Sequence, residues 1–579
     1  MDKLLTKVQQ EELLSRISAA MSTQSTWTDA LCNHPILSSI LTSLLAYSIY
    51  LVYFYFTSPL RRYPGPLLAK LTTLYRLWHV AGGLSHKVYA DLHYPRPNSK
   101  GKRKINPLVC IGPDQLSVSS PELAKVVMNV KDEWLKTSFY QVSGLMVNGK
   151  VVYNMFAQPD PHRHAAEKKL VAKFYTAGAM AGMEGHVDRS LELFCRELEG
   201  RFMNDSKKGG GVVDLNAWID YYAWDSNGNV TFSRPVGFLE AGRDIDGTLR
   251  TVERNMDYLG FASVIPTVDR LLFKNPRLGA PVATNVDHIV NRALKILVDR
   301  YQGTDDVKNK KTSTGGEAAE EDLLDKFISV KREQKYRELS GKGDGQEEEE
   351  EEEEKVTDDL IVGWILINLF AGGDTTACTI RSAIYYSLKT PGVWDRLRAE
   401  LASAGLTKEQ CPLSYKTVRN IPYLDALITE SLRILPGVSF GLERYVPKGG
   451  YHVPEHLGGG FLPEKTILSI NPYVLAHHPE AFGEDVDEFK PERWLKAEGE
   501  TEDEFRERLQ RMNNAMVVWG GGSRACLGKQ LALLQIYKVV ATLAVLYDIE
   551  LVDPEKEWWV RNSWFVRQAG WDVRMRKRE

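Results

Sequence analysis

The sequence predicts a mainly α-helical protein with a smaller β part, preceded by a single N-terminal transmembrane helix. Three observations support this fold class: residues 36–56 carry no charge, helical patterning dominates from about 160 to 430, and strands and loops follow Pro436. Apolar residues make up 43% of the chain and charged residues 26%, which is ordinary for a globular protein with a sizeable core.

The uncharged stretch 36–56 predicts the membrane anchor. At about 1.5 Å per residue it reaches roughly 32 Å, which matches the hydrocarbon core of a bilayer. A buried core helix is the alternative, but Arg61 and Arg62 follow at once, within a proline-rich neck that we expect to be stiff and non-helical. Because positive charges favour the cytosolic side, the rest of the chain is expected to face the cytosol.

The chain is expected to have four successive parts. They are an N-terminal polar segment (1–35), the anchor (36–56), the neck (57–66) and one large domain (67–579). Within the large domain, residues 341–355 include an unbroken run of glutamates from 347 to 354. Such a charged segment cannot form a core, so we expect a solvated, disordered loop; an acidic docking segment is the alternative.

Charge and cysteine content narrow the class of protein. The formal net charge is −3, so the basic surplus typical of nucleic-acid binding is missing. The six cysteines are scattered, without C-x-x-C or zinc-finger spacing. This favours a reducing compartment and leaves a lone cysteine available as a functional thiolate.

Individual elements of the large domain follow from local signals. Ser120 before Pro121 predicts a capped helix start, and Thr357 or Asp358 is expected to cap a long apolar helix. The remaining expectations are strands at 108–111 and 116–118, helices at 358–389, 421–435 and 529–547, and strands within 559–575.

A glycine-rich cysteine loop, residues 519–528, carries the first chemical signal. Three consecutive glycines allow close approach to a flat object. Cys526 comes just before a predicted helix, whose dipole and free N–H groups favour a thiolate, and Arg524 is near enough to neutralise an anion. Such a thiolate suits a soft metal centre. The alternative is a buried cysteine in a glycine-rich turn with no chemical role.

The second signal lies inside the long apolar helix, at Ala371-Gly372-Gly373-Asp374-Thr375-Thr376. Adjacent glycines cost about 1 kcal/mol each relative to alanine in a helix, and a buried acid adds to this cost. A threonine hydroxyl can bond back to a carbonyl and open the helix locally. A widened turn with a hydroxyl and a carboxylate could deliver protons; a kink needed only for packing is the alternative.

Both segments resemble signatures of the cytochrome P450 family. The cysteine loop is similar to Phe-Gly-x-Gly-x-Arg-x-Cys-x-Gly, with Trp519 in place of Phe and matches at Gly520, Gly522, Arg524, Cys526 and Gly528. The helix segment resembles Ala-Gly-x-Asp-Thr-Thr. The resemblance implies the P450 fold, haem b with Cys526 as the axial ligand of iron, and a proton relay of Asp374 and Thr375 that helps to break the O–O bond of O2.

Further residues follow from the same resemblance. Glu430, Arg433 and Arg493 match a buried structural triad formed by the family's Glu-x-x-Arg and Pro-Glu-Arg segments. The cofactor-binding residues that the resemblance implies are Trp519, Gly520 and the propionate-side groups Arg524, Arg444, His164 and Lys168. The expected substrate-pocket residues are Ile367, Phe370, Ala371, Val438, Ser439 and Phe440.

The resemblance implies a monooxygenase that inserts one atom of O2 into a lipophilic small molecule. Its electrons would come from NADPH through a reductase, with cytochrome b5 as a further partner, at the endoplasmic reticulum membrane. The chain looks most similar to filamentous-fungal members such as pisatin demethylase and benzoate hydroxylases, which suggests secondary metabolism or xenobiotic oxidation. A haem-thiolate isomerase or dehydratase, and a non-catalytic haem sensor, are the alternatives.

Overall fold

The computed structural model describes residue 15 and residues 35–95, 103–131, 133–147, 150–203, 210–275, 287–305, 320–340 and 355–578. The chain divides into two compact units, residues 1–62 and 63–579. The predicted polar segment 1–35 and the acidic insert 341–355 lie almost entirely outside the described residues.

The first unit contains the expected apolar helix, α2 (Pro35–Thr57). Residues 38–57 of this helix are long and apolar enough to cross a membrane, and none of the span is buried against protein. The neck is not wholly non-helical as expected, because Pro59–Arg62 form one 3₁₀ turn. The fixed φ of proline suits the first position of a helical turn, so Pro59 starts this turn rather than preventing it.

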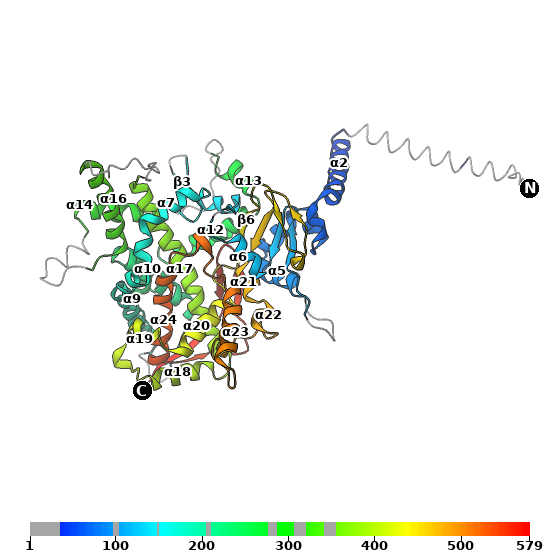
Figure 1. Ribbon diagram of the computed structural model, residues 1–579. Coiled ribbons are helices and arrows are strands. Elements are labelled where there is room, and N and C mark those ends of the chain that lie inside the picture. Colours follow the sequence, from blue (N-terminus) through cyan, green and yellow to red (C-terminus); the bar gives the residue numbers. More distant parts are fainter. Residues whose placement is uncertain are drawn as a thin grey trace, which may run out of the picture. The chain divides into compact units, whose positions relative to one another are not determined.

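The second unit is mainly helical (Figure 1). Its α-helices are α3 (Leu67–Leu71), α4 (Leu74–Ala81), α5 (Ser85–His93), α6 (Pro121–Val127), α7 (Pro161–Val171), α8 (Ala177–Ala181), α9 (Glu184–Leu198), α10 (Leu215–Phe232), α11 (Phe238–Ala241), α12 (Thr248–Ala262), α13 (Pro266–Val268), α14 (Asp287–Gln302), α16 (Leu323–Ser340), α17 (Asp358–Lys389), α18 (Val393–Ser403), α19 (Tyr415–Val418), α20 (Pro422–Ile434), α21 (Pro472–Ala476), α22 (Pro479–Phe482), α23 (Glu502–Ala515) and α24 (Lys529–Leu546).

Helix α17 lies at the centre of this unit, beside α10, α20 and α24. Its residues contribute to both large apolar clusters of the core. Helices α17 and α24 are apolar enough to cross a membrane, but half of the α17 window and 78% of the α24 window are buried inside the protein. A helix that is apolar all round is typical of such a buried position, so these two are core helices.

The strands form small sheets beside the helices. They are β1 (Leu108–Gly112), β2 (Gln115–Val118), β3 (Leu145–Val147), β4 (Lys150–Val152), β5 (Gly211–Val213), β6 (Leu442–Tyr445), β7 (Tyr451–His452), β8 (Phe461–Leu462), β9 (Ile467–Ile470), β10 (Tyr547–Leu551), β11 (Trp559–Asn562), β12 (Val566–Ala569) and β13 (Val573–Lys577). The largest described sheet has the order β1-β2-β9-β6, in which only β2 and β9 run parallel.

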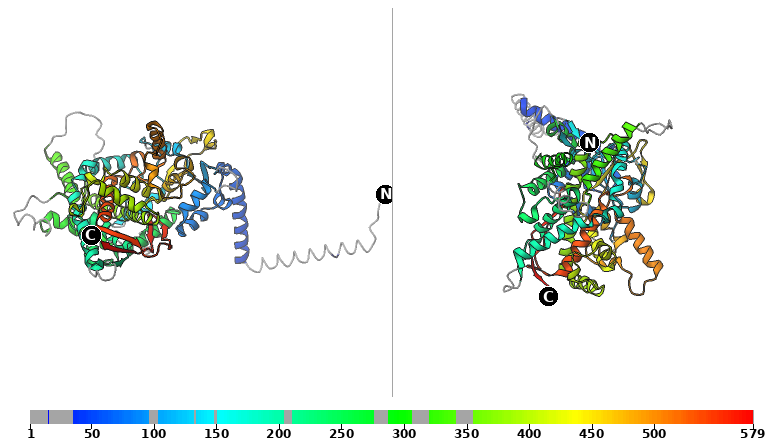
Figure 2. Two further views of the ribbon diagram at one scale, coloured as in Figure 1. Left: turned by 90° about the horizontal axis from the view of Figure 1, so that it is seen from below. Right: turned by 90° about the vertical axis from the view of Figure 1, so that its left-hand side faces the viewer.

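Two strand pairings bring distant segments together. Strand β6 pairs with β9, and an isolated bridge places Lys136 opposite Arg444 of β6. Strand β13 lies between β10 and β5, so the C-terminal strands, red in Figure 2, lie beside the connection between α9 and α10. The bridge between Lys136 and Arg444 brings together two cations of the candidate site.

The sequence-predicted elements agree closely with these bounds. The Ser120 side chain accepts a hydrogen bond from the Leu123 N–H and caps α6, as expected. Thr357, rather than Asp358, caps α17 by accepting a hydrogen bond from the Leu360 N–H. Helices α20 and α24 match their expected ranges within one residue at each end.

Candidate functional site

The cysteine loop forms a tight turn that ends at the start of α24. The backbone N–H of Cys526 donates a hydrogen bond to the carbonyl oxygen of Trp519 at 2.8 Å and closes the turn. Gly522 has a φ of +59°, and a Cβ at this position would lie 2.2 Å from the carbonyl oxygen of Asn129. Only glycine combines this conformation with this close approach, so Gly522 fixes the path of the loop.

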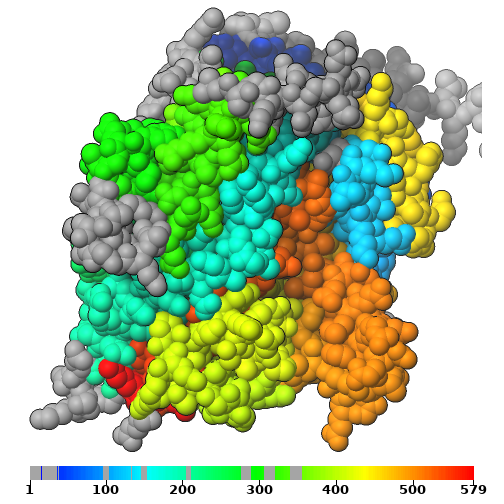
Figure 3. Space-filling view, turned by 60° about the vertical axis from the view of Figure 1, so that its left-hand side comes forward, coloured from blue at the N-terminus to red at the C-terminus, as the bar shows by residue number. Residues whose placement is uncertain are grey.

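Neighbouring segments frame this loop. Figure 3 shows the loop region, in dark orange, between α7 in cyan and the segment around α6 in light blue. The Lys529 ammonium lies 6.0 Å from the ring centroid of Trp519, which is partly buried. Gly520, like Gly522, has a positive φ, at +70°.

Cys526 is accessible to solvent, although protein atoms surround its sulfur closely. The residue is exposed, yet enough protein surrounds its sulfur that burial raises the pKa of the thiol. The N–H groups of Gly528 and Lys529, with the charges of Lys529 and Lys168, oppose this rise. A coordinated metal ion would deprotonate the thiol outright, and these N–H groups and cations would then stabilise the thiolate.

Four cations surround His164 on α7. Burial, followed by the charges of Arg524, Lys136, Lys168 and Arg444, lowers the pKa of the imidazole to about 3. His164 is therefore neutral at physiological pH. Four like charges around one neutral ring repel one another, so the cluster favours an anion carrying more than one negative charge.

The contacts of this cluster connect it to the cysteine loop. The Lys168 ammonium donates to the carbonyl oxygen of Ser523 at 2.6 Å, and Arg524 Nη1 donates to the carbonyl oxygen of Gln158 at 2.9 Å. The His164 Nδ1 atom is buried without a hydrogen-bond partner in the described structure. An exposed thiol beside clustered cations and an unsatisfied imidazole nitrogen fits haem, which presents an iron and two propionates.

The acid and the hydroxyl on α17 lie in different surroundings. The Thr375 hydroxyl donates to the carbonyl oxygen of Ala371 at 2.7 Å, the back-bond expected from the sequence. Asp374 Oδ1 accepts a hydrogen bond from Trp224 Nε1 on α10 at 3.2 Å. Burial and, to a lesser degree, the charge of the nearby Asp220 raise the pKa of Asp374 to about 7, so this carboxyl can gain or lose a proton near neutral pH.

The two adjacent glycines of α17 permit close packing of α10. A Cβ on Gly372 would lie 2.7 Å from Oδ1 of Asn227, and one on Gly373 would lie 2.6 Å from Nε1 of Trp224. Helix α17 runs unbroken from Asp358 to Lys389. Neither the local opening nor the kink expected from the sequence interrupts the helix. The glycines instead make room for α10, and this close packing allows the contact between the Trp224 indole and the Asp374 carboxyl.

Three segments meet at Thr375. A Cβ on Gly437 would lie 3.2 Å from the carbonyl oxygen of Thr375, and the Val566 N–H donates to the Gly437 carbonyl oxygen at 3.0 Å. The chain after α20 and the hairpin of β11 and β12 are therefore held against the middle of α17.

An aromatic cluster joins two of these segments, at Phe440 and Trp564, to two rings from earlier in the chain. The rings of Phe139 and Trp564 are stacked at 5.0 Å, and Phe440 lies 6.0 Å from Phe139 and 6.4 Å from Trp564. Phe156 meets Trp564 edge-on at 6.0 Å. Together these four rings form an apolar cluster, in which Phe139, Phe440 and Trp564 are buried.

The predicted pocket residues divide into two groups. Ile367, Ala371 and Val438 are partly accessible, as lining residues should be, and Phe440 belongs to the aromatic cluster. Phe370 packs edge-on against Trp224 at 6.0 Å, so it faces α10. Ser439 is fully buried, and its hydroxyl donates to the Pro436 carbonyl oxygen at 2.8 Å, so its side chain completes a turn.

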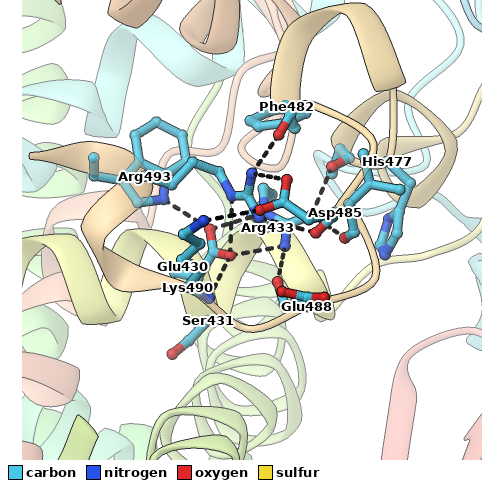
Figure 4. Close-up of polar contacts among 12 residues, drawn as sticks. Glu430, Ser431, Arg433, His477, Phe482, Asp485, Glu488, Lys490 and Arg493 are labelled. Atoms are coloured by element: carbon cyan, nitrogen blue, oxygen red, sulfur yellow. Dashed lines mark hydrogen bonds and ion pairs between the residues drawn. The ribbon is translucent and has the colours of Figure 1, made fainter. Parts of the chain in front are cut away.

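The expected triad of Glu430, Arg433 and Arg493 is assembled in one buried network (Figure 4). Arg433 Nε and Nη2 each lie 2.8 Å from a different oxygen of the Glu430 carboxylate. Arg493 Nε lies 3.4 Å from Oε1 of Glu430. Trp494 Nε1 donates to Oε2 of Glu430 at 2.9 Å. The carboxylate thus anchors α20 to the 3₁₀ turn η9 (Pro491–Trp494).

Sequence reasoning missed several residues of this region. Lys136 comes from a loop without a recognisable pattern, and its bridge to Arg444 brings it into the cation cluster. Tyr140 was also missed; its hydroxyl accepts a hydrogen bond from Arg444 Nη1 at 2.9 Å. Trp224 lies 150 residues before Asp374, and no local signal connects the two.

Comparison with known proteins agrees with this geometry. The cytochrome P450 family model matches residues 108–568. The cytochrome P450 monooxygenase cfoH of Aspergillus candidus is 37% identical over 551 residues, covering 95% of this chain and 94% of that protein. The cytochrome P450 monooxygenase pkfB of Emericella nidulans is 30% identical over 514 residues, covering 89% and 91%.

A solved structure supports the fold. A crystal structure of a cytochrome P450, CYP102L1, superposes with a TM-score of 0.60 at 19% identity, covering 81% of this chain and 91% of that chain. Haem with a thiolate ligand and O2 are common to the family. With the family model matching most of its length, this chain belongs to the cytochrome P450 family.

Proposed function

We propose that the chain is a membrane-anchored monooxygenase that inserts one atom of O2 into a lipophilic small molecule, with electrons from NADPH delivered by a reductase. The general activity, that of an oxidoreductase that incorporates oxygen, follows from membership of the family. The observation that carries the proposal is the exposed Cys526 thiol beside the cation cluster of Lys136, Lys168, Arg444 and Arg524.

Each residue has a distinct task in this proposal. When bound, haem supplies the activation of O2 that oxygen insertion requires. Cys526 would hold the iron through its thiolate, and the cation cluster would pair with the propionates. Asp374 would hold a proton near neutral pH. The Thr375 hydroxyl, which can both donate and accept a hydrogen bond, would pass this proton toward the O2 substrate.

The aromatic cluster of Phe139, Phe156, Phe440 and Trp564 supports a lipophilic substrate, because rigid apolar walls bind apolar ligands. Ile367, Ala371 and Val438 would complete the pocket. The relatives reported above are fungal monooxygenases, which supports a role in secondary metabolism or xenobiotic oxidation.

Helix α2 supports anchoring in a membrane. We place the chain in the endoplasmic reticulum membrane with the large domain facing the cytosol, since Arg61 and Arg62 follow the span. Its partners there would be membrane lipid, an NADPH-dependent reductase and cytochrome b5.

The alternatives make different demands on α17. A haem-thiolate isomerase or dehydratase needs no reductase, and a haem sensor needs no turnover. Neither requires an acid with a pKa of about 7 beside a threonine hydroxyl, and both groups are present at Asp374 and Thr375.

Incubation of the purified enzyme with NADPH, a fungal reductase, ¹⁸O₂ and a panel of apolar compounds tests the proposed function. The expected result is a product that gains one ¹⁸O atom and requires NADPH. A product formed equally well without NADPH and O2 would favour the isomerase or dehydratase.

Thr375→Ala is expected to uncouple the enzyme. NADPH consumption continues, but the product formed per NADPH falls by at least about tenfold, because a positioned proton-transfer group typically contributes 10²–10⁴-fold. Thr379→Ala is the matched control, since Thr379 makes the same back-bond one turn later, to the Thr375 carbonyl oxygen at 3.2 Å. Full coupling in Thr375→Ala would remove Thr375 from the relay.

A further inference from the structure

The indole of Trp224 is the hydrogen-bond donor that the structure shows on the Asp374 carboxyl. Nε1 of Trp224 lies 3.2 Å from Oδ1 of Asp374. We infer that Trp224 is a positioning residue. It fixes the orientation of the Asp374 carboxyl and tunes the proton affinity of this group, which delivers a proton toward the O2 substrate. This inference rests on the function proposed above.

The packing of α10 on α17 is built around this contact. Trp224 is 1% exposed and meets Phe370 and Phe238 edge-on, at 6.0 and 6.2 Å between ring centroids. Gly373 is adjacent to Asp374, and any side chain there would displace the indole, because a Cβ would lie 2.6 Å from Nε1. Gly373 therefore provides the room that the hydrogen bond needs.

Space lies beside the indole. Trp224 and Leu369 line a cavity of about 210 Å³ that also includes Phe232, Ile289 and Ile296. The side of the indole that faces this cavity lacks close packing, so the hydrogen bond to Asp374 and the edge-on contacts with Phe370 and Phe238 hold the ring in place.

Several charged groups act on the same carboxyl. Asp220 on α10 and Glu253 on α12 raise the pKa of Asp374, while Arg381 on α17 lowers it. Arg381 is itself paired with Asp220, at 2.7 Å. Against burial, which has the largest effect, the Trp224 N–H stabilises the ionised carboxylate and lowers the pKa.

The sign of the effect follows from these contributions. Removing the donor removes a stabilising bond to the ionised form, so Asp374 should hold its proton to higher pH. A hydrogen bond to a charged group contributes enough for a shift of about one pKa unit. The carboxyl would also lose its fixed orientation, which lowers the efficiency of proton delivery.

Trp224→Phe in the full-length holoenzyme tests the inference, because phenylalanine keeps an aromatic ring but has no donor. The infrared band of the protonated Asp374 carboxyl, assigned by its loss in Asp374→Asn, is followed against pH. We expect the pH at the midpoint of this titration to be higher in Trp224→Phe than in the wild type, by about one pH unit. The pH dependence of product formed per NADPH should shift in the same direction, with a several-fold loss of coupling at neutral pH.

Two further variants separate positioning from packing. Gly373→Ala keeps Trp224 but displaces the indole, so it should reproduce the infrared shift. Trp218→Phe is the matched control on the same helix, since Trp218 is also buried (5% exposed) and packs against Phe202 and Tyr221. Neither the infrared midpoint nor the coupling should change in this control.

A double-mutant comparison decides the role. Adding Trp224→Phe to Asp374→Asn should cause no further loss of coupling, since Trp224 acts through Asp374. An unchanged infrared midpoint in Trp224→Phe, or an additive loss in the double variant, would overturn the inference. If no compound is oxygenated by the wild type, the proposed function fails, whereas the infrared titration still reports on the contact.

Discussion

Replacing Cys526 by alanine is expected to abolish oxygen insertion and leave the fold largely intact. The side chain is exposed, so its removal takes little apolar surface from the core. The turn should persist, because the bond from the Cys526 N–H to the Trp519 carbonyl oxygen is made by the backbone. What is lost is the thiolate proposed to hold the iron and to tune its reactivity.

Product formation and thermal unfolding of Cys526→Ala, measured side by side, test this expectation. Product should fall below detection, with a melting temperature near that of the wild-type apoprotein. Cys411→Ala is the control, since Cys411 is a partly exposed cysteine outside the site and its loss should leave turnover unchanged. Turnover by Cys526→Ala near the wild-type rate would contradict the ligand assignment.

Glu430→Ala is expected to destabilise the large domain severely. The carboxylate accepts hydrogen bonds from Arg433, Arg493 and Trp494, and Glu430 and Arg433 are completely buried. Removing one partner of a buried ion pair typically costs 3–5 kcal/mol, since the remaining charge is uncompensated. Domains are stable by only about 5–15 kcal/mol, so much of the variant should unfold or fail to accumulate.

Denaturant titration of Glu430→Ala measures this cost. The control is Arg506→Ala on α23, which removes an exposed pair with Asp503 at 3.0 Å, where the side chains are 76% and 84% exposed. An exposed pair contributes less than about 1 kcal/mol. A Glu430→Ala midpoint as close to wild type as that of Arg506→Ala would show that the network does not anchor α20.

Local signals were enough to predict the main elements. The apolar run of α17, with its threonine cap, and the cysteine loop before α24 depend on residues close in sequence, so both were found with nearly correct bounds. The 3₁₀ turn at Pro59–Arg62 was missed because proline can either begin or end a helical turn.

The residues that sequence reasoning missed are brought in by tertiary contacts. Lys136 reaches the cation cluster through a strand bridge, and Trp224 reaches Asp374 through the packing of α10 on α17. Ser439 was expected in the pocket from the family resemblance, but its hydroxyl donates a hydrogen bond within the turn at Pro436. The contacts of Lys136 and Trp224 join residues far apart in the sequence, so they have no signature in a single stretch of chain.

The central claim is that Cys526 is the thiolate ligand of a haem. The most direct measurement is the difference spectrum of the reduced, purified protein with carbon monoxide, recorded for the wild type and for Cys526→Ala. We predict the Soret band of a thiolate-ligated haem in the wild type and its loss in the variant. A band typical of histidine-ligated haem in the wild type, or a thiolate band that persists in Cys526→Ala, would contradict the claim.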